Sequence, residues 1–367
     1  MSKQLGNSPD LLAMIDKYGA DAVRFGILIA SPAGNDLLWD EASNEQGRNF
    51  NNKIWNALKL VKMWETRVKS LPAGQAGQES GVGSLPAGQA GQEPGKNFAV
   101  TWFENRLLEV KAELEIQFKE FRLSEALKTL YSLVWDDFCS WYLEWIKPSR
   151  STDGSGVEEP FDKATYDKTV AFFEELLQLL HPFMPFITED IYHLLKERDD
   201  DLTVKQYPAL QTPDETVLLQ GRLLKEVITA VRDAKNKNGI KPKEVIKLHI
   251  ESQNAHQYKI IEEFLVKQIN ADSLLFTEGP VPNTIPIVVG KDKFYLETII
   301  PINTETQKEE LLKELNYLKG FLVSVDKKLN NQRFIQNAKA EVIELEQKKK
   351  ADAEAKIRII EESLVSL

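Results

Sequence analysis

The strongest constraint on the fold is a repeating pattern of apolar residues near the end of the chain. Along one segment the apolar positions step by four and three: Leu311, Leu315, Leu318, Leu322, Val325 and Leu329. After a polar stretch the same steps return in Ala353, Ile357, Ile360, Leu364 and Leu367. Such steps form the seam of a coiled coil. Two seams joined by a short turn predict an antiparallel helical hairpin over residues 304–367, with arms of about 35–40 Å. A parallel coil that dimerises is the alternative.

Helical periodicity also governs most of the preceding sequence. Within residues 50–68, and again within 103–121, apolar side chains recur three or four positions apart. Amphipathic helices bury their apolar faces against one another. We therefore expect a mainly α protein, with an antiparallel helical bundle over 98–240 and further helices, preceded by a loop, within 1–69.

The spacing of the apolar residues changes after Gly239. Several short apolar segments there have a spacing near two, which is typical of strands, and they surround one helical segment. This pattern predicts a small α/β unit over residues 241–303.

A repeated string interrupts the helical pattern. The ten residues SLPAGQAGQE occupy positions 70–79 and return unchanged at 84–93. They are rich in glycine, contain no aromatic residue and offer little to bury. We predict a disordered linker over residues 70–97, inserted into a surface loop.

The composition excludes several kinds of site and location. A single cysteine, Cys139, rules out disulfides and CxxC zinc sites, and its apolar, aromatic surroundings are typical of a buried structural thiol. The four histidines show no metal-ligand spacing, so we expect no metal site. No run of about 18 apolar residues and no signal-peptide pattern occurs. We expect a cytoplasmic protein without membrane contact.

Charge is distributed unevenly. The net charge of −10 argues against a protein that is basic throughout, as many nucleic-acid binders are. Residues 222–247 nevertheless contain eight Lys and Arg residues against three acids. A phosphate-binding stripe and a solvated helix face both explain such a run. The same two readings apply to lysines and an arginine near the tip of the predicted hairpin. The candidates for phosphate contact are Arg232, Lys235, Lys237, Lys327, Lys328 and Arg333.

Only the first residues suggest chemistry. The chain contains no glycine-rich nucleotide fingerprint, P-loop, HExxH or GxSxG signature. It begins MSKQLGN, which places Lys3 on a loop rich in small and polar residues. A lysine on such a loop can reach polyphosphate oxygens and neutralise the charge that develops as pyrophosphate leaves.

Taken together, these segments resemble one family. Residues 1–41 resemble the region that follows the Lys-Met-Ser-Lys-Ser signature of class I aminoacyl-tRNA synthetases. The strings FCSWYLEWIKP and HPFMPFITEDIYHLL look like the anticodon-binding bundle of the valine, isoleucine and leucine enzymes. RFIQNAKAEVIELEQKKK, inside the predicted hairpin, resembles the tRNA-binding arm of the valine enzymes. The isoleucine enzymes usually end in a cysteine-rich zinc module, which one cysteine cannot build. The valine-specific group is therefore preferred over its isoleucine and leucine relatives.

The resemblance implies roles for individual residues. Met1, Ser2 and Lys3 correspond to the ATP-binding signature, with Lys3 as the catalytic lysine. The intact enzymes use magnesium-bound ATP to attach valine to its tRNA. The bundle would read the anticodon by stacking and hydrogen bonding, with Trp141, Tyr142, Trp145 and Lys147 as candidates. Packing residues of the bundle core are the alternative for these aromatics.

Three departures limit what this chain is expected to do alone. The signature's first lysine is absent and Gln4 replaces its last serine. Lys339 stands where the family more often has proline. The catalytic nucleotide-binding fold and the editing domain would precede Met1.

We therefore expect a monomer that binds valine tRNA, holds no cofactor tightly and does not aminoacylate by itself. A separate chain carrying the catalytic half is a further candidate partner. The alternatives are a free-standing tRNA-binding or interaction module, and a coiled-coil dimer with no role in RNA binding.

Overall fold

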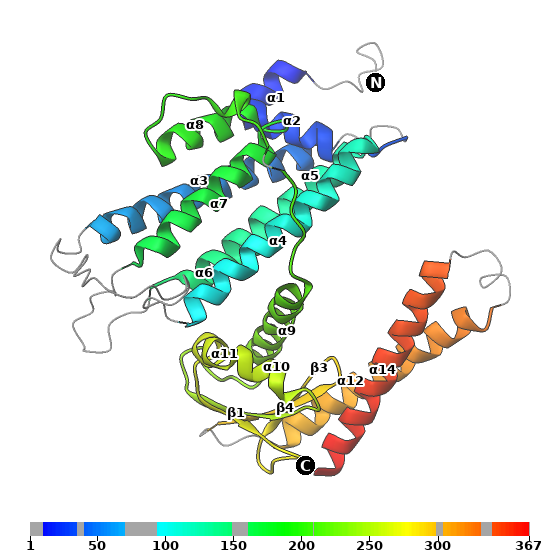
Figure 1. Cartoon of the computed structure of the whole chain (residues 1–367). Coiled ribbons are helices and arrows are strands. Elements are labelled where there is room, and N and C mark those ends of the chain that lie inside the picture. The colour runs from blue at the N-terminus through cyan, green and yellow to red at the C-terminus, as the bar shows by residue number, and fades with distance from the viewer. Residues whose placement is uncertain are drawn as a thin grey trace, which may run out of the picture. The chain divides into compact units, whose positions relative to one another are not determined.

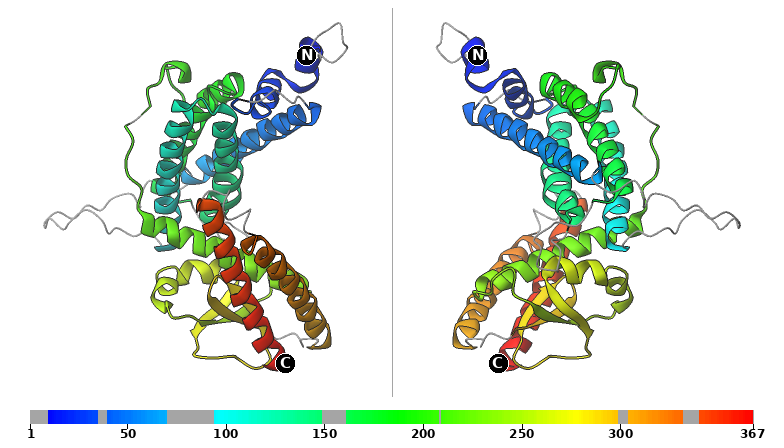
Figure 2. Two further views of the ribbon diagram at one scale, coloured as in Figure 1. Left: turned by 90° about the vertical axis from the view of Figure 1, so that its right-hand side faces the viewer. Right: turned by 90° about the vertical axis from the view of Figure 1, so that its left-hand side faces the viewer.

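The computed structural model describes residues 10–34, 40–69, 94–148, 161–207, 209–298, 304–331 and 340–366. The chain divides into two compact units, Met1–Leu218 and Leu219–Leu367, and each is described by itself. Figures 1 and 2 show the helices and the sheet of these units. The signature loop, both copies of the repeated string and Arg333 lie outside the described residues.

The first unit is helical throughout its described residues. Its elements are α1 (Leu11–Tyr18), α2 (Ala20–Ile29), α3 (Glu41–Lys69), α4 (Pro94–Lys119), α5 (Leu123–Ser132), the π-helical η2 (Leu133–Tyr142), α6 (Leu143–Ile146), α7 (Lys163–Leu180), α8 (Pro185–Leu195) and a short 3₁₀ turn, η3 (Leu202–Val204). The long helices lie side by side in Figure 1, and the predicted helical bundle is confirmed. α4 begins at Pro94, inside the end of the predicted linker, because proline is favoured at the first position of a helix.

Aromatic side chains fill the core of this bundle. Phe103 of α4 meets Phe138 of η2 and Phe172 of α7, with ring centroids 5.3 and 5.2 Å apart. All three rings are nearly or fully buried. Each ring removes a large apolar area from water, which makes such clusters a main source of stability.

Two polar contacts join elements that are far apart in the sequence. The Asp21 carboxylate of α2 accepts hydrogen bonds from the backbone N–H groups of Phe186 and Ile187, at 3.3 and 2.6 Å. It therefore caps the N-terminus of α8, whose own N-cap residue, Met184, makes no side-chain cap bond. Arg24 of α2 donates to the carbonyl of Phe183 at 3.2 Å.

The second unit contains most of α9 (Glu215–Lys237) and a small mixed sheet. The strands are β1 (Ile246–Glu251), β2 (Ala271–Phe276), β3 (Ile285–Val289) and β4 (Asp292–Glu297), in the order β2-β1-β4-β3. β1 and β2 pair in parallel, joined by the helices α10 (Ala255–Ile260) and α11 (Glu262–Ile269), and the other two pairings are antiparallel. The predicted small α/β unit is confirmed, whereas the exact domain limits remain predictions.

The unit ends in a helical hairpin of α12 (Thr304–Leu329) and α14 (Ala340–Ser366). With 26 and 27 residues, the two helices are each about 39–40 Å long. Leu315 and Val325 of α12 and Ala353 and Ile360 of α14 are buried, as the seam predicts. No helix among the described residues has the length and apolarity that crossing a membrane requires.

Candidate nucleic-acid interface

Tyr142, one of the predicted stacking residues, lies in the core of the bundle. Its side chain is fully buried, and its ring lies 4.9 Å from that of Phe103 and 5.6 Å from that of Phe172. Its hydroxyl donates to Thr169 Oγ1 at 2.8 Å, because the Thr169 hydroxyl itself donates to the Thr165 carbonyl at 2.7 Å. Burial raises the pKa of Tyr142. This side chain offers no ring face to a base.

The other three candidates of this segment differ in exposure. Trp145 is 2% exposed and packs against Trp102, with ring centroids 4.6 Å apart. Trp141 is half-buried, and Lys147 is exposed with its Nζ 3.5 Å from a Glu144 carboxylate oxygen. Trp141 and Lys147 therefore lie within reach of a ligand, whereas Trp145 has the surroundings of a packing residue.

The basic run of residues 222–247 places a polar strip on α9. Arg222, Lys225, Thr229, Arg232 and Asn236 follow one another along the helix within about 80° of its circumference, at 3.6 residues per turn. All are exposed or half-exposed. The acids of this helix segment, Glu226 and Asp233, stand beside the strip rather than in it. We call these five residues the α9 strip; Lys237, at the end of α9, is also exposed.

Lys235 is the member of this run that the structure removes from the surface. It is 3% exposed, and its Nζ donates to the carbonyls of Glu244 and Ile269, each at 2.8 Å. A longer contact of 3.5 Å reaches the carbonyl of Pro242. Burial lowers the pKa of Lys235 more than the nearby Glu244 raises it. The ammonium joins the end of α9 to the end of α11 and to the segment before β1, and its burial keeps it away from RNA.

The hairpin carries more lysines than the sequence analysis selected. Lys327 is exposed, and the Lys328 Nζ lies 3.6 Å from a carboxylate oxygen of Glu346 across the hairpin. Sequence reasoning missed Lys348, Lys349 and Lys350, although they form an uninterrupted run. Antiparallel pairing brings this run opposite 326–328, so lysines of both helices gather in one region of the hairpin.

Glu346 organises part of this lysine group. Its side chain is 7% exposed and lies 2.7 Å from the Lys349 Nζ. The hydrogen bond from Lys349, with a weaker attraction from Lys328, holds the pKa of Glu346 below its ordinary value. One buried carboxylate thus contacts two lysines, and about half of each lysine side chain remains exposed to water.

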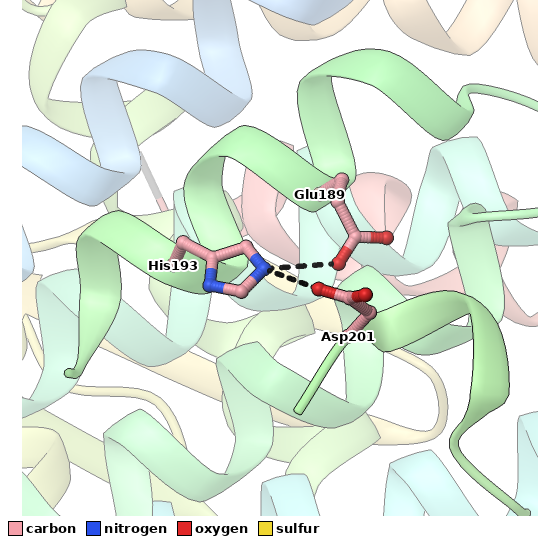
Figure 3. A group of neighbouring side chains, drawn as sticks. All are labelled: Glu189, His193 and Asp201. Carbon is pink, nitrogen blue, oxygen red and sulfur yellow. Dashed lines mark hydrogen bonds and ion pairs between the residues drawn. The ribbon is translucent and has the colours of Figure 1, made fainter. Parts of the chain in front are cut away.

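A separate cluster in the first unit has groups that could hold a metal ion. Glu189 and His193 of α8 and Asp201 each offer one ligand atom, and these atoms lie within 4.8 Å of one another (Figure 3). His193 Nε2 lies 3.1 Å from Asp201 Oδ1, and the Leu202 N–H donates to Glu189 Oε1 at 2.7 Å. These hydrogen bonds fasten the segment after α8 back onto that helix. They account for the grouping without an ion.

Two family descriptions match the chain. The family described as the anticodon-binding domain of tRNA ligase matches residues 101–250. The family described as the valyl tRNA synthetase tRNA binding arm matches residues 303–367. The first match covers most of the described bundle together with α9 and β1, and the second covers the hairpin.

Similar proteins agree with these matches. The valine–tRNA ligases of Parabacteroides distasonis, Christiangramia forsetii and Fusobacterium nucleatum are 41%, 39% and 30% identical to this chain, over its whole length. The chain spans only 39–40% of each of these relatives. Among solved structures, a leucyl-tRNA synthetase of Agrobacterium radiobacter in a ternary complex with tRNA matches 59% of the chain and 22% of its own length, at 18% identity and a TM-score of 0.38. The chain belongs to the valine–tRNA ligase family and corresponds to the C-terminal region of these enzymes, with the anticodon-binding domain and the tRNA-binding arm.

Proposed function

We propose that this chain binds valine tRNA and does not attach valine to it when it acts alone. One observation carries the proposal. The two matched regions lie in well-packed parts of the chain: the helices of the bundle enclose an aromatic core, and the seam of the hairpin contains buried apolar residues. We expect both regions to present their surfaces to RNA in this chain alone.

The distribution of charge supports RNA as the ligand. The chain is acidic overall, with a net charge of −10, yet lysines and arginines gather on α9 and on the hairpin. Phosphate contacts supply much of the affinity of nucleic-acid binding. The proposed contacts are Trp141, Lys147, the α9 strip, Lys237, Lys327, Lys328, Arg333 and the lysine run 348–350. We leave Tyr142, Trp145 and Lys235 out of this surface, because all three are buried.

Binding is tested by fluorescence anisotropy with a labelled valine tRNA and a second tRNA of different anticodon. We expect tighter binding of valine tRNA, and an affinity that falls steeply with salt, by roughly 0.7–0.9 in the logarithmic slope for each phosphate contact. Equal affinity for both tRNAs would reduce the proposal to unspecific RNA binding. No binding at low salt would overturn it and favour an interaction module without an RNA role.

The expected lack of aminoacylation is supported by where the two matches lie. Both family descriptions refer to tRNA binding or to the anticodon, and the chain matches only 39% of the length of the Parabacteroides distasonis relative. Met1, Ser2 and Lys3 are the ATP-contacting residues that the resemblance assigns to this chain, and three residues of one loop are too few to hold ATP tightly, so we expect no tight cofactor binding. Valine-dependent exchange of pyrophosphate into ATP by the purified chain would contradict this part of the proposal.

A partner that carries the catalytic half would restore the reaction. In that case Lys3 would contact the ATP phosphates, and Lys3→Ala would abolish exchange in the reconstituted pair while leaving tRNA binding unchanged. If the chain is a free-standing tRNA-binding module, the same substitution is silent in every assay.

A monomer is the state that the hairpin favours. The seam of α12 is covered by α14 of the same chain, so the seam is not available to a second copy. Analytical ultracentrifugation should give a single species of 41.8 kDa. A stable dimer would support the coiled-coil alternative.

A further inference from the structure

The pairing of the hairpin defines which face of α12 points away from α14. Lys350 Nζ lies 2.8 Å from Asp326 Oδ1, and Lys319 Nζ lies 2.6 Å from Glu361 Oε1, which fixes an antiparallel register. Leu315 and Val325 are buried against α14. Positions two residues after each seam position therefore lie on the opposite side of α12, about half a turn from the seam.

Five residues occupy this outer side from position 313 onward. Lys313, Tyr317, Gly320, Ser324 and Lys327 follow one another at steps of four and three, within about 80° of the helix circumference. All five are exposed. They span 14 residue steps, or about 21 Å at 1.5 Å per residue. We call these residues the outer strip.

The chemistry of the outer strip is unusual for the outside of a coiled coil. Such positions normally carry solvated charges of both signs, but the strip contains no carboxylate. Its aromatic residue, Tyr317, is 71% exposed. Neither lysine forms an ion pair with another side chain that the structure describes. Most of the Tyr317 ring is exposed, so this ring and the lysines on either side of it contribute little to packing within the chain.

Gly320 provides a second, independent observation. Glycine weakens the interior of a helix relative to alanine, yet nothing in the hairpin requires it here. A Cβ atom added at position 320 would meet no atom within 4 Å, and its backbone is part of α12. By contrast, at Gly47 of α3 a Cβ would lie 2.7 Å from the Ala22 carbonyl oxygen, so packing explains that glycine. The space left by the missing side chain of Gly320 therefore faces away from α14 and is open.

We propose that the outer strip is the face of the arm that lies against tRNA. Tyr317 stacks on an exposed base or ribose, Gly320 and Ser324 let the RNA backbone approach the helix closely, and Lys313 and Lys327 neutralise phosphates on either side. The absence of carboxylates matches a polyanion, and aromatic stacking is a general means of holding unpaired bases. The inference rests on the proposed tRNA binding and names the surface that carries it.

Two substitutions in the full chain test the strip. Gly320→Ala adds one methyl group into open space, so it should raise the melting temperature of the hairpin while weakening binding of valine tRNA about threefold or more. Tyr317→Ala should weaken binding about fivefold or more, because base stacking on a tyrosine is lost. Leu345→Ala is the matched control: Leu345 is 53% exposed on α14, outside the strip, and its loss should leave binding unchanged. Circular dichroism verifies that each variant is folded.

The opposite behaviour of stability and affinity in Gly320→Ala is the decisive readout. A purely structural glycine would give a stabilised hairpin with unchanged or improved tRNA binding, and that result overturns the inference. If Tyr317→Ala and Gly320→Ala both bind as well as the parent chain, the strip faces another partner, such as a protein, and the inference is likewise overturned. If the parent chain itself fails to bind tRNA at low salt, the proposed function fails first and the inference fails with it.

Discussion

Aromatic residues have opposite environments in two regions of the molecule, the helices η2 and α6 of the bundle and helix α12 of the arm. Along α5, η2 and α6, rings recur at helical spacing, and Phe138, Tyr142 and Trp145 are buried in the core. On α12 the seam is built from aliphatic residues, and the aromatic Tyr317 stands 71% exposed on the far side. Helical spacing of aromatics therefore indicates a core. A single aromatic that falls outside the apolar spacing is the better indicator of a ligand surface.

The largest expected effect comes from the bundle side of this comparison. Trp145→Ala should lower the free energy of unfolding of the first unit by about 3–5 kcal/mol, because it empties a large site in a packed core. All seven tryptophans lie before residue 218, so tryptophan fluorescence in urea follows that unit alone.

Trp141→Ala, in η2 directly before α6, is the matched variant. Trp141 is half-buried, so its loss should cost less stability and should weaken tRNA binding. If Trp145→Ala instead leaves the stability unchanged and abolishes tRNA binding, the separation into core and surface aromatics is wrong.

A buried charge should give the next largest effect. Lys235→Ala leaves the carbonyls of Glu244 and Ile269 without their donor, so the second unit should lose about 1–3 kcal/mol in stability. Thermal unfolding followed by circular dichroism measures the loss. Lys237→Ala, two residues along the same helix and exposed, is the control and should change stability little. Equal effects of the two substitutions would show that Lys235 is a surface lysine after all.

The same residue predicts a pH dependence. Burial lowers the pKa of Lys235 in the folded state, while the unfolded chain keeps the ordinary value of 10.5. The unfolded state then binds more protons between these two values, so stability contributed by this residue rises as pH increases towards 10.5. The difference in melting temperature between the parent chain and Lys235→Met should therefore shift in favour of the parent as the pH is raised through this window. A difference that is constant with pH would contradict the assignment.

The sequence predicted the elements whose pattern is local. Steps of four and three gave the hairpin seam, and the change to a period near two gave the strands after Gly239, because both patterns arise from residues that are close together in the chain. The π-helical form of η2 was not predicted, since the spacing of Trp135, Phe138 and Tyr142 also suits an α-helix.

Long-range contacts explain what the sequence did not reveal about the site. Lys235 lies in a basic run and resembles its exposed neighbours until the Ile269 carbonyl, 34 positions away, is brought to it. Asp21 likewise caps a helix that begins more than 160 residues later. Lys348, Lys349 and Lys350 were visible as a run, but only the antiparallel pairing places them beside Asp326 and Lys328.

Substitutions in the α9 strip should have a smaller effect, which appears mainly in how tRNA affinity depends on salt concentration. Arg222→Gln, Lys225→Gln and Arg232→Gln should each weaken tRNA binding to a similar extent for every tRNA tested and reduce the logarithmic salt slope by about 1. Lys267→Gln, on the exposed side of α11, is the control for a lysine of the same unit outside the strip. If the strip variants keep the salt slope of the parent chain, the charged side chains of α9 do not contact phosphates and only solvate the face of the helix.

The smallest effect is expected at the cluster of Glu189, His193 and Asp201. His193 is 40% exposed and its contact to Asp201 is a surface hydrogen bond, so His193→Ala should cost less than about 1 kcal/mol and leave tRNA binding unchanged. Zinc should not raise the melting temperature of the parent chain, because Glu189 Oε1 already accepts the Leu202 N–H and the grouping is explained by hydrogen bonds. A zinc-dependent rise that disappears in His193→Ala would instead make this cluster a metal site. The bundle would then carry a metal site in addition to the RNA contacts proposed at Trp141 and Lys147, and the contrast with the arm would rest on the buried aromatic residues alone.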